Sequence, residues 1–261
     1  MLNIYTVFLN RLDLLHLQKK SFDKNLKNKF KLNVLDNSLK KNDTKKLKNL
    51  CKQNNIRYLR YPKKYNFRNL KPSDNAYRAY QYIKENYLDK KSEMICFIDN
   101  DIFLTRKIDI SRIMENYDIA GLEQRRSFFI FSISYFWQGL ILINLKKFNK
   151  EKIDLINFKP TKFPIKTDTA GSTKKIFKIY RNKTKKILIF KNTSHLKKWH
   201  LQKFFNKKLK KSYNLSFKME FIYKDFFLHY GSGSNWRGNS QIFEKDKTIF
   251  LKNYLKSKGV K

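Results

Sequence analysis

Two carboxylates one residue apart follow a short apolar run. Asp99 and Asp101 come directly after residues 94–98, Met-Ile-Cys-Phe-Ile, a composition typical of a buried strand. Side chains two residues apart can project the same way, so both carboxylates can converge on one cation. Carboxylate oxygens suit Mg²⁺ or Mn²⁺, ions that keep open positions for the phosphates of a substrate. The pattern predicts a metal site at a strand end, and the alternative is an Asp-Asn-Asp turn that caps the strand.

A second polar stretch follows an apolar run near the C-terminus. The run Phe-Phe-Leu at 226–228 is followed by His229, and residues 231–234 are Gly-Ser-Gly-Ser. A loop of this composition presents several backbone N–H groups that can cradle a phosphate. The stretch therefore predicts a second strand end with binding capacity, the alternative being a structural histidine.

The elements that would position these residues alternate along the first half of the chain. Strands are expected at 2–9, 31–35, 56–60 and 94–98, with helices between them and a helix beginning at 71–75. This order predicts the α/β class, with a mixed, mostly parallel, Rossmann-like sheet flanked by helices. Ligands of such sheets bind beyond the carboxyl ends of the strands. Asn10 is expected to cap the first helix, with Asp13 near its positive end.

The second half predicts further strands and a basic region. A helix is expected at 110–117, a strand at 118–123, and two strands in the apolar run 127–145, divided by Gly139. That run is also near the length of a membrane span, the alternative we consider less favoured because polar residues interrupt it. Alternation within 176–190 predicts a hairpin, and a basic helix is expected at 195–211.

Together these segments resemble GT-A type glycosyltransferases, which transfer a sugar from a nucleotide diphosphate donor. The motifs that carry the resemblance stand in the family's order: Asp99-Asn100-Asp101, then Trp137-Gln138-Gly139, then the loop from His229 to Trp236, the last two being similar to the glycogenin-like group. Ser234-Asn235 stands where that group usually has Lys-Pro. The resemblance implies one catalytic domain over 1–261, with a nucleotide-binding half at 1–125, a sugar and acceptor half at 126–240, and a basic tail at 241–261.

The resemblance also implies roles for individual residues. Mn²⁺ or Mg²⁺ would be held by Asp99, Asp101 and His229. Asp168 would take the proton of the acceptor hydroxyl if transfer inverts the anomeric carbon, the alternative being a helix cap. Asp36 would contact the base or ribose, or else cap a loop, and Arg78 would contact the diphosphate or sugar, or else pair at the surface. The predicted donor-binding residues are Asn10, Arg11, Asp36, Arg78, Asp99, Asn100, Trp137, Gln138, Gly139, Gly231 and Ser232.

The charge of the chain bears on its partners. The formal net charge is +38, from 59 Lys and Arg against 21 Asp and Glu, which attracts polyanions and phosphorylated substrates. We expect a nucleotide diphosphate sugar donor, a glycan or other hydroxyl acceptor, peripheral contact with an anionic membrane, and no specific nucleic acid. Two cysteines make no disulfide framework, and a cytoplasmic location is expected. The alternatives are a basic nucleic-acid-binding protein and a nucleotidyltransferase that uses the same acids and releases pyrophosphate.

Overall fold

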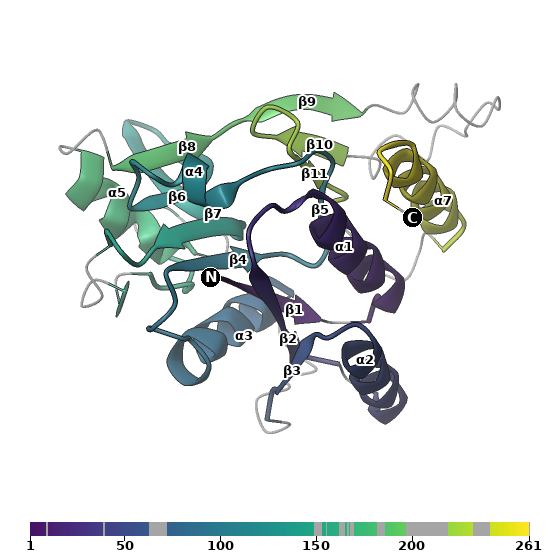
Figure 1. Cartoon of the computed structure of the whole chain (residues 1–261). Coiled ribbons are helices and arrows are strands. Elements are labelled where there is room, and N and C mark those ends of the chain that lie inside the picture. Colours follow the sequence, from purple (N-terminus) through teal and green to yellow (C-terminus); the bar gives the residue numbers. More distant parts are fainter. Residues whose placement is uncertain are drawn as a thin grey trace. The chain divides into compact units, whose positions relative to one another are not determined.

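The chain forms two compact units. Figure 1 shows the whole chain, coloured along the sequence. The computed structural model describes residues 1–8, 10–38, 40–62, 72–148, 153–154, 156–161, 165, 167, 170–181, 186–196, 219–231 and 241–260. Unit 1 comprises Met1–Asn10, Asn28–Asp99 and Asp109–Phe190, and unit 2 comprises Arg11–Lys27, Asn100–Ile108 and Lys191–Lys261. The predicted functional division at 125 and 240 remains a prediction.

Unit 1 contains a seven-stranded sheet of order β3-β2-β1-β4-β7-β6-β8. Its strands are β1 (Leu2–Phe8), β2 (Phe30–Asp36), β3 (Arg57–Arg60), β4 (Met94–Ile98), β6 (Ile119–Phe128), β7 (Phe131–Asn144) and β8 (Ile187–Phe190). The pairings β2–β3, β1–β2, β1–β4 and β6–β8 are parallel, whereas β7 runs antiparallel to both β4 and β6. The predicted mixed, mostly parallel sheet is confirmed.

Helices of unit 1 bury one face each against apolar side chains. They are α2 (Lys41–Gln53), α3 (Pro72–Asn86), the short α4 (Ile110–Ile113) and α5 (Lys174–Arg181), with a 3₁₀ turn at Gly171–Thr173. Tyr80 of α3 contacts Phe97 of β4 and Phe158, with ring centroids 6.1 and 5.3 Å away. Such tilted and edge-on aromatic contacts are the arrangements that ring quadrupoles favour. This aromatic cluster therefore fixes α3 against β4, the strand that leads to Asp99.

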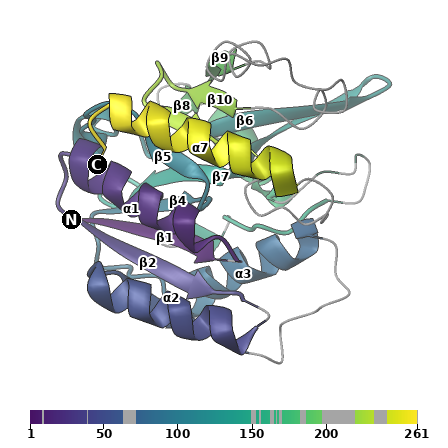
Figure 2. The ribbon, with the colours of Figure 1, turned by 90° about the vertical axis from the view of Figure 1, so that its right-hand side faces the viewer.

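Unit 2 packs two helices and a small sheet around its own core. Its elements are α1 (Leu12–Asn25), β5 (Ile102–Leu104), β9 (Asn192–Leu196), β10 (Met219–Ile222), β11 (Phe227–His229) and α7 (Gln241–Ser257). The sheet has the order β5-β11-β10-β9 and is antiparallel throughout. Leu14 of α1 and Leu251 of α7 share one buried cluster with Phe103 and Leu228, and the two helices lie side by side in both views (Figure 2).

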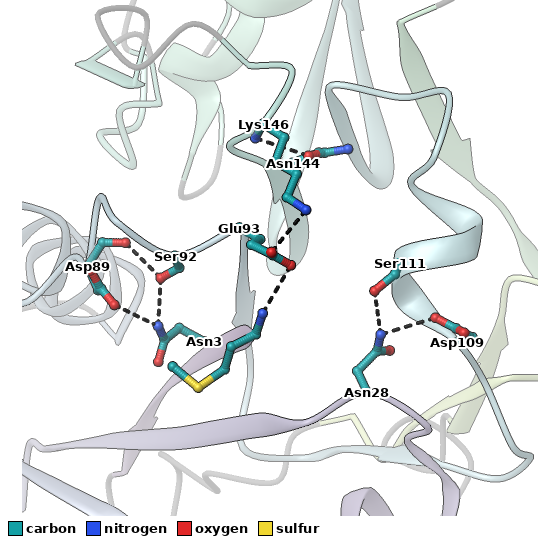
Figure 3. A network of polar contacts seen from close by, with 10 residues as sticks. Asn3, Asn28, Asp89, Ser92, Glu93, Asp109, Ser111, Asn144 and Lys146 are labelled. Carbon is teal, nitrogen blue, oxygen red and sulfur yellow. Dashed lines mark hydrogen bonds and ion pairs between the residues drawn. The ribbon is translucent and has the colours of Figure 1, made fainter.

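A polar network holds the beginning of β4 in place, as Figure 3 shows. The side-chain amide of Asn3 on β1 donates to Ser92 Oγ at 2.6 Å and to Asp89 Oδ2 at 3.2 Å. Lys146, just after β7, pairs with Glu93 at 2.9 Å. These contacts tie the turn before β4 to both neighbouring strands. Because β4 is then fixed in register, the position of Asp99 beyond its far end is fixed as well.

Several local predictions were wrong. Asn10 does not cap α1, because Arg11 occupies the N-cap position and makes no side-chain cap bond. The hairpin expected at 176–190 is helix α5 followed by β8. Ile176 and Tyr180 are both buried, and their spacing of four places them on one helical face. Helix α7 covers most of the predicted basic tail at 241–261, which stays a prediction, and Leu251 of this helix is fully buried.

The apolar run 127–145 lies in β6 and β7, and β7 continues through Gly139 where two strands were expected. Among the described helices, none is both long and apolar enough to cross a membrane. Of the predicted basic helix at 195–211, the first residues belong to strand β9, and 197–211 lies outside the described residues.

Candidate functional site

Asp99 of unit 1 follows β4 and is held by α3 and β7. The hydroxyl of Tyr80 lies 2.8 Å from Asp99 Oδ1 and 2.9 Å from the carbonyl oxygen of Ile98, so two acceptors share its one proton. The backbone N–H of Asp99 donates to the carbonyl of Gly139 at 2.9 Å. Tyr80 is buried, which strengthens these bonds relative to bonds made in water. The carboxylate is therefore positioned by Tyr80, a residue for which the sequence analysis predicted no role at the site.

Trp137 and Gly139 lie where the pairing of β7 with β6 is interrupted. Gly121 pairs with Ile141 whereas Glu123 pairs with Phe136, so the β7 residues between them leave the ladder. Irregularities of this kind occur next to sites because they re-aim side chains. A Cβ on Gly139 would lie 2.3 Å from the Trp137 ring and 2.7 Å from Asp99 Oδ2. The indole and the carboxylate thus come together over a glycine that has no room for a side chain.

Removing the Tyr80 hydroxyl tests this support. We expect Tyr80→Phe to lower the free energy of unfolding by about 1–2 kcal/mol, because a buried, charge-assisted hydrogen bond is lost. Urea unfolding measures the change, with Tyr117→Phe, a half-buried tyrosine of the same unit, as the matched control. A double-mutant cycle with Asp99→Asn then isolates the coupling between the two side chains. If the two changes in the free energy of unfolding were strictly additive, the hydrogen bond from Tyr80 to Asp99 would be contradicted.

Asp101, His229 and Glu220 form a row in unit 2. His229 Nε2 lies 3.7 Å from Asp101 Oδ1, and His229 Nδ1 lies 3.8 Å from Glu220 Oε2. The row follows from strand pairing, since His229 is opposite Ile102 on one side and opposite Glu220 on the other. The backbone N–H of Tyr230 also donates to the carbonyl of Asp101 at 2.8 Å. The sequence analysis did not predict Glu220, because only the antiparallel pairing of β10 with β11 brings this residue to His229.

The separation of Asp101 from His229 suits ligands of one cation. Both of the row's distances exceed hydrogen-bond length. Two donors that each bind Mg²⁺ or Mn²⁺ at about 2.1 Å lie at most about 4.2 Å apart, and 3.7 Å falls within that limit. In the described part of the chain, no group of three or more His, Cys, Asp or Glu side chains is arranged to hold a metal ion. The predicted set of Asp99, Asp101 and His229 stays a prediction.

Two cations flank the ring of Tyr230, next to His229. The Arg11 guanidinium makes two 2.9 Å bonds to Asp13 and a 3.0 Å bond to Thr248 Oγ1, and lies 5.9 Å from the ring centroid. Burial alone would raise the pKa of Asp13, but the bond and charge of Arg11 outweigh it and lower that pKa. Lys247 of α7 is fully buried, lies 4.1 Å from the same ring, and donates to the carbonyl of Gly231 at 2.6 Å.

Lys247 therefore holds the carbonyl of Gly231, the first residue of the Gly-Ser stretch, and Gly231 itself lies in the left-handed region at φ 69°. Sequence patterning missed this lysine because residues 241–261 were taken together as a basic tail. Its helical register, which places it on the same face as Leu251, was the signal that could have found it.

The Asp36 carboxylate is occupied by its own chain. It accepts bonds from the backbone N–H of Ser38 at 3.0 Å, from the Ser38 hydroxyl, and from the Tyr58 hydroxyl at 2.7 Å. Burial and the bond to Asp36 raise the pKa of Tyr58. This is the loop-capping arrangement that the sequence left open, and a nucleoside contact remains a prediction.

The other predicted residues are distributed as follows. Arg78 lies on α3 with its guanidinium 5.8 Å from the Tyr77 ring, and Asn10 is exposed. Asn100 and Gln138 are buried, and the Asn100 Nδ2 and Gln138 Oε1 atoms have no hydrogen-bond partner among the described residues. Asp168 and Ser232 lie outside the described residues.

Comparisons with known proteins find similarity only at the level of structure. No family model matches the chain, and no curated protein matches it in sequence. The galactosyltransferase LgtC, solved with donor and acceptor sugar analogues, is 16% identical with a TM-score of 0.41, over 59% of this chain and 62% of LgtC.

Two further glycosyltransferases are similar to the chain. GlyE of Streptococcus pneumoniae TIGR4 is 13% identical with a TM-score of 0.44, over 99% of this chain and 64% of GlyE. Mouse xyloside xylosyltransferase 1 is 10% identical with a TM-score of 0.39, over 72% of this chain and 84% of that protein. The match thus spans less than two thirds of LgtC and of GlyE.

Proposed function

We propose that the chain is a metal-dependent glycosyltransferase that moves a sugar from a nucleotide diphosphate sugar to a glycan or other hydroxyl acceptor. The observation that carries the proposal is the pair formed by the buried Asp101 and the half-buried His229, 3.7 Å apart at the edge of the β5–β11 ladder. Asp101 and His229 would hold Mn²⁺ or Mg²⁺, together with Asp99, two residues earlier in the chain. When bound, the ion would supply Lewis-acid stabilisation of the departing diphosphate.

The remaining residues of the proposal bind and orient the substrates. Trp137 would offer an apolar face to the donor sugar, and Arg78 and the loop from Gly231 would add donors for the diphosphate. Lys247 would position that loop through the Gly231 carbonyl. Asp168 is proposed as the group that accepts the acceptor proton if configuration inverts.

The direct test is release of nucleoside diphosphate by purified protein from a panel of nucleotide sugars, with Mn²⁺ or with chelator. Metal-dependent release from one donor supports the proposal and names the sugar. Release of pyrophosphate would instead identify a nucleotidyltransferase. If folded protein releases no product from any donor of the panel and binds nucleic acid with a steep salt dependence, the nucleic-acid-binding alternative is favoured.

Glu220 should tune the proposed metal site through His229. We expect Glu220→Gln to weaken Mn²⁺ binding about tenfold to a hundredfold, because a carboxylate beside the second ring nitrogen orients a ligating histidine and raises its basicity. Titration of Mn²⁺ followed by electron paramagnetic resonance measures affinity without reference to turnover. Glu115→Gln, on an exposed carboxylate of unit 1, is the matched control. Equal Mn²⁺ affinities for Glu220→Gln and the parent protein would remove Glu220 from the site.

A further inference from the structure

The β6–β7 hairpin extends beyond the sheet as a two-stranded ribbon. In β6, only Ile119–Leu122 pair with β8, and in β7, only Leu140–Asn144 pair with β4. Between these contacts, residues 123–128 and 131–136 pair with one another alone among the described strands. Figure 2 shows this teal ribbon running out from the label of β6. Both edges of the outer hairpin are therefore unpaired with any other described strand.

The turn of this ribbon presents three consecutive large apolar side chains to solvent. Phe129, Ile130 and Phe131 are 89%, 91% and 53% exposed. Elsewhere in the described chain, the exposed large apolar residues stand singly, as Met1, Ile179 and Ile249 do. Isolated exposed residues of this kind are ordinary, whereas a contiguous apolar group at a protruding turn marks an interaction site. We call residues 129–131 the apolar tip.

A basic groove lies at the base of the same ribbon. A cavity of about 910 Å³ lies between the ribbon and α5, and it is open to solvent. The cations that line it are Arg125 of β6 and Lys174, Lys175 and Lys178 of α5, and among the described lining residues Glu123 is the one carboxylate. The ring of Phe177 lies 4.5 Å from that of Phe136, which attaches α5 to the ribbon. The groove thus gathers positive charge on the element that carries the apolar tip.

We propose that the apolar tip and the basic groove together form a docking surface for an anionic lipid membrane. A tip of this kind inserts shallowly among acyl chains, while lysines and arginines remain level with the headgroup phosphates. Charge complementarity selects this occupant. A second copy of the chain would bring its own net charge of +38 to the groove, and a nucleic acid would match the cations but not Ile130.

A vesicle-binding experiment at two salt concentrations separates the contribution of the basic groove from that of the apolar tip. The full chain is sedimented with phosphatidylcholine vesicles that contain or lack phosphatidylserine. Salt is set to about 0.1 M or about 1 M, conditions in which charge acts over about 10 Å or about 3 Å. Each cation near an anionic surface strengthens binding about fivefold. At low salt, the affinity of K174A/K175A/K178A for vesicles with phosphatidylserine should therefore fall about a hundredfold. The affinity of K45A/K46A/K52A, on exposed α2 positions, should fall much less.

Replacing the tip should remove the salt-resistant part of binding. We expect F129S/I130S/F131S to reduce partitioning at least about tenfold at both salt concentrations, because the apolar contact is lost. Ile249→Ser, an exposed isoleucine of α7, controls for Ile130→Ser. Unfolding midpoints accompany every variant, so that loss of binding is not confused with loss of fold.

A label reports insertion directly. Cys51 and Cys96 are both buried, so an environment-sensitive fluorophore can be attached selectively at I130C, with K45C as the control position. Vesicles with phosphatidylserine should shift the emission of the label at 130 to the blue and leave the label at 45 unchanged. The proposal is overturned if the label at 130 does not respond, if the α2 variant loses as much binding as the α5 variant, or if the tip variant abolishes self-association and no vesicle binding is seen.

Discussion

Asp101→Ala is expected to reduce metal-dependent release of nucleoside diphosphate on the order of a thousandfold, equivalent to about 4 kcal/mol of transition-state stabilisation. The substitution removes the carboxylate that faces His229 at 3.7 Å. The backbone carbonyl of Asp101, which accepts from the Tyr230 N–H, is kept. We therefore expect the pairing of β5 with β11 to survive, so the loss should appear in catalysis and Mn²⁺ affinity more than in stability.

Two controls make the Asp101 result specific. Asp101→Asn keeps the shape but removes the charge, and it should retain less Mn²⁺ affinity than the parent protein because the amide oxygen is a weaker ligand. Asp23→Ala, on a half-exposed carboxylate of α1 in the same unit, should leave release and Mn²⁺ binding unchanged. Parent-like Mn²⁺ binding and release in Asp101→Ala would rule out the proposed metal ligand.

Gly139→Ala is expected to damage both the stability and the activity of the protein. Its Cβ would lie 2.3 Å from the Trp137 ring and 2.7 Å from Asp99 Oδ2. The indole end can swing away, but the Asp99 carboxylate is held by Tyr80. We expect the free energy of unfolding to fall by about 1–3 kcal/mol through overpacking, and nucleoside diphosphate release to fall about a hundredfold through displacement of Asp99.

A second-site variant separates the two contacts of that methyl group. In the Trp137→Ala background the indole is absent, so Gly139→Ala should cost less stability than it does in the parent. Release should still fall on adding Gly139→Ala, because the contact with Asp99 remains. Urea unfolding and the release assay measure the two effects. Unchanged stability and release in Gly139→Ala would show that the close approach is not maintained in solution.

Much of the sheet was predictable because its strands carry strong local patterns. β1, β2 and β4 are apolar runs that end in polar loops, and their alternation with helical stripes predicted the parallel order. The predicted hairpin at 176–190 was wrong at α5. The short run of apolar residues and lysines at 176–180 was taken for a strand, although it also fits the spacing of a helix. Burial of Ile176 and Tyr180 against the sheet decided the outcome, and that contact is tertiary information.

The candidate site divides in the same way. Asp99, Asp101 and His229 could be proposed from the sequence because each follows a local apolar run. Tyr80, Glu220 and Lys247 were not, since each acts through a neighbour distant in sequence that only the folded chain brings to it. The interruption of the β6–β7 ladder at Trp137 to Gly139 also depends on pairing, which no single-strand pattern encodes.

The segments of the two units alternate along the chain, and this order has a consequence for folding during synthesis on the ribosome. Every segment of unit 1 has been translated once Phe190 is reached. Unit 2 begins at Arg11, but the core into which Leu14 packs also requires Leu251 and Leu255 from the final helix. Helix α1 is translated early, but its partners in α7 are translated only near the end of synthesis. Until then α1 exposes apolar surface, to which chaperones bind.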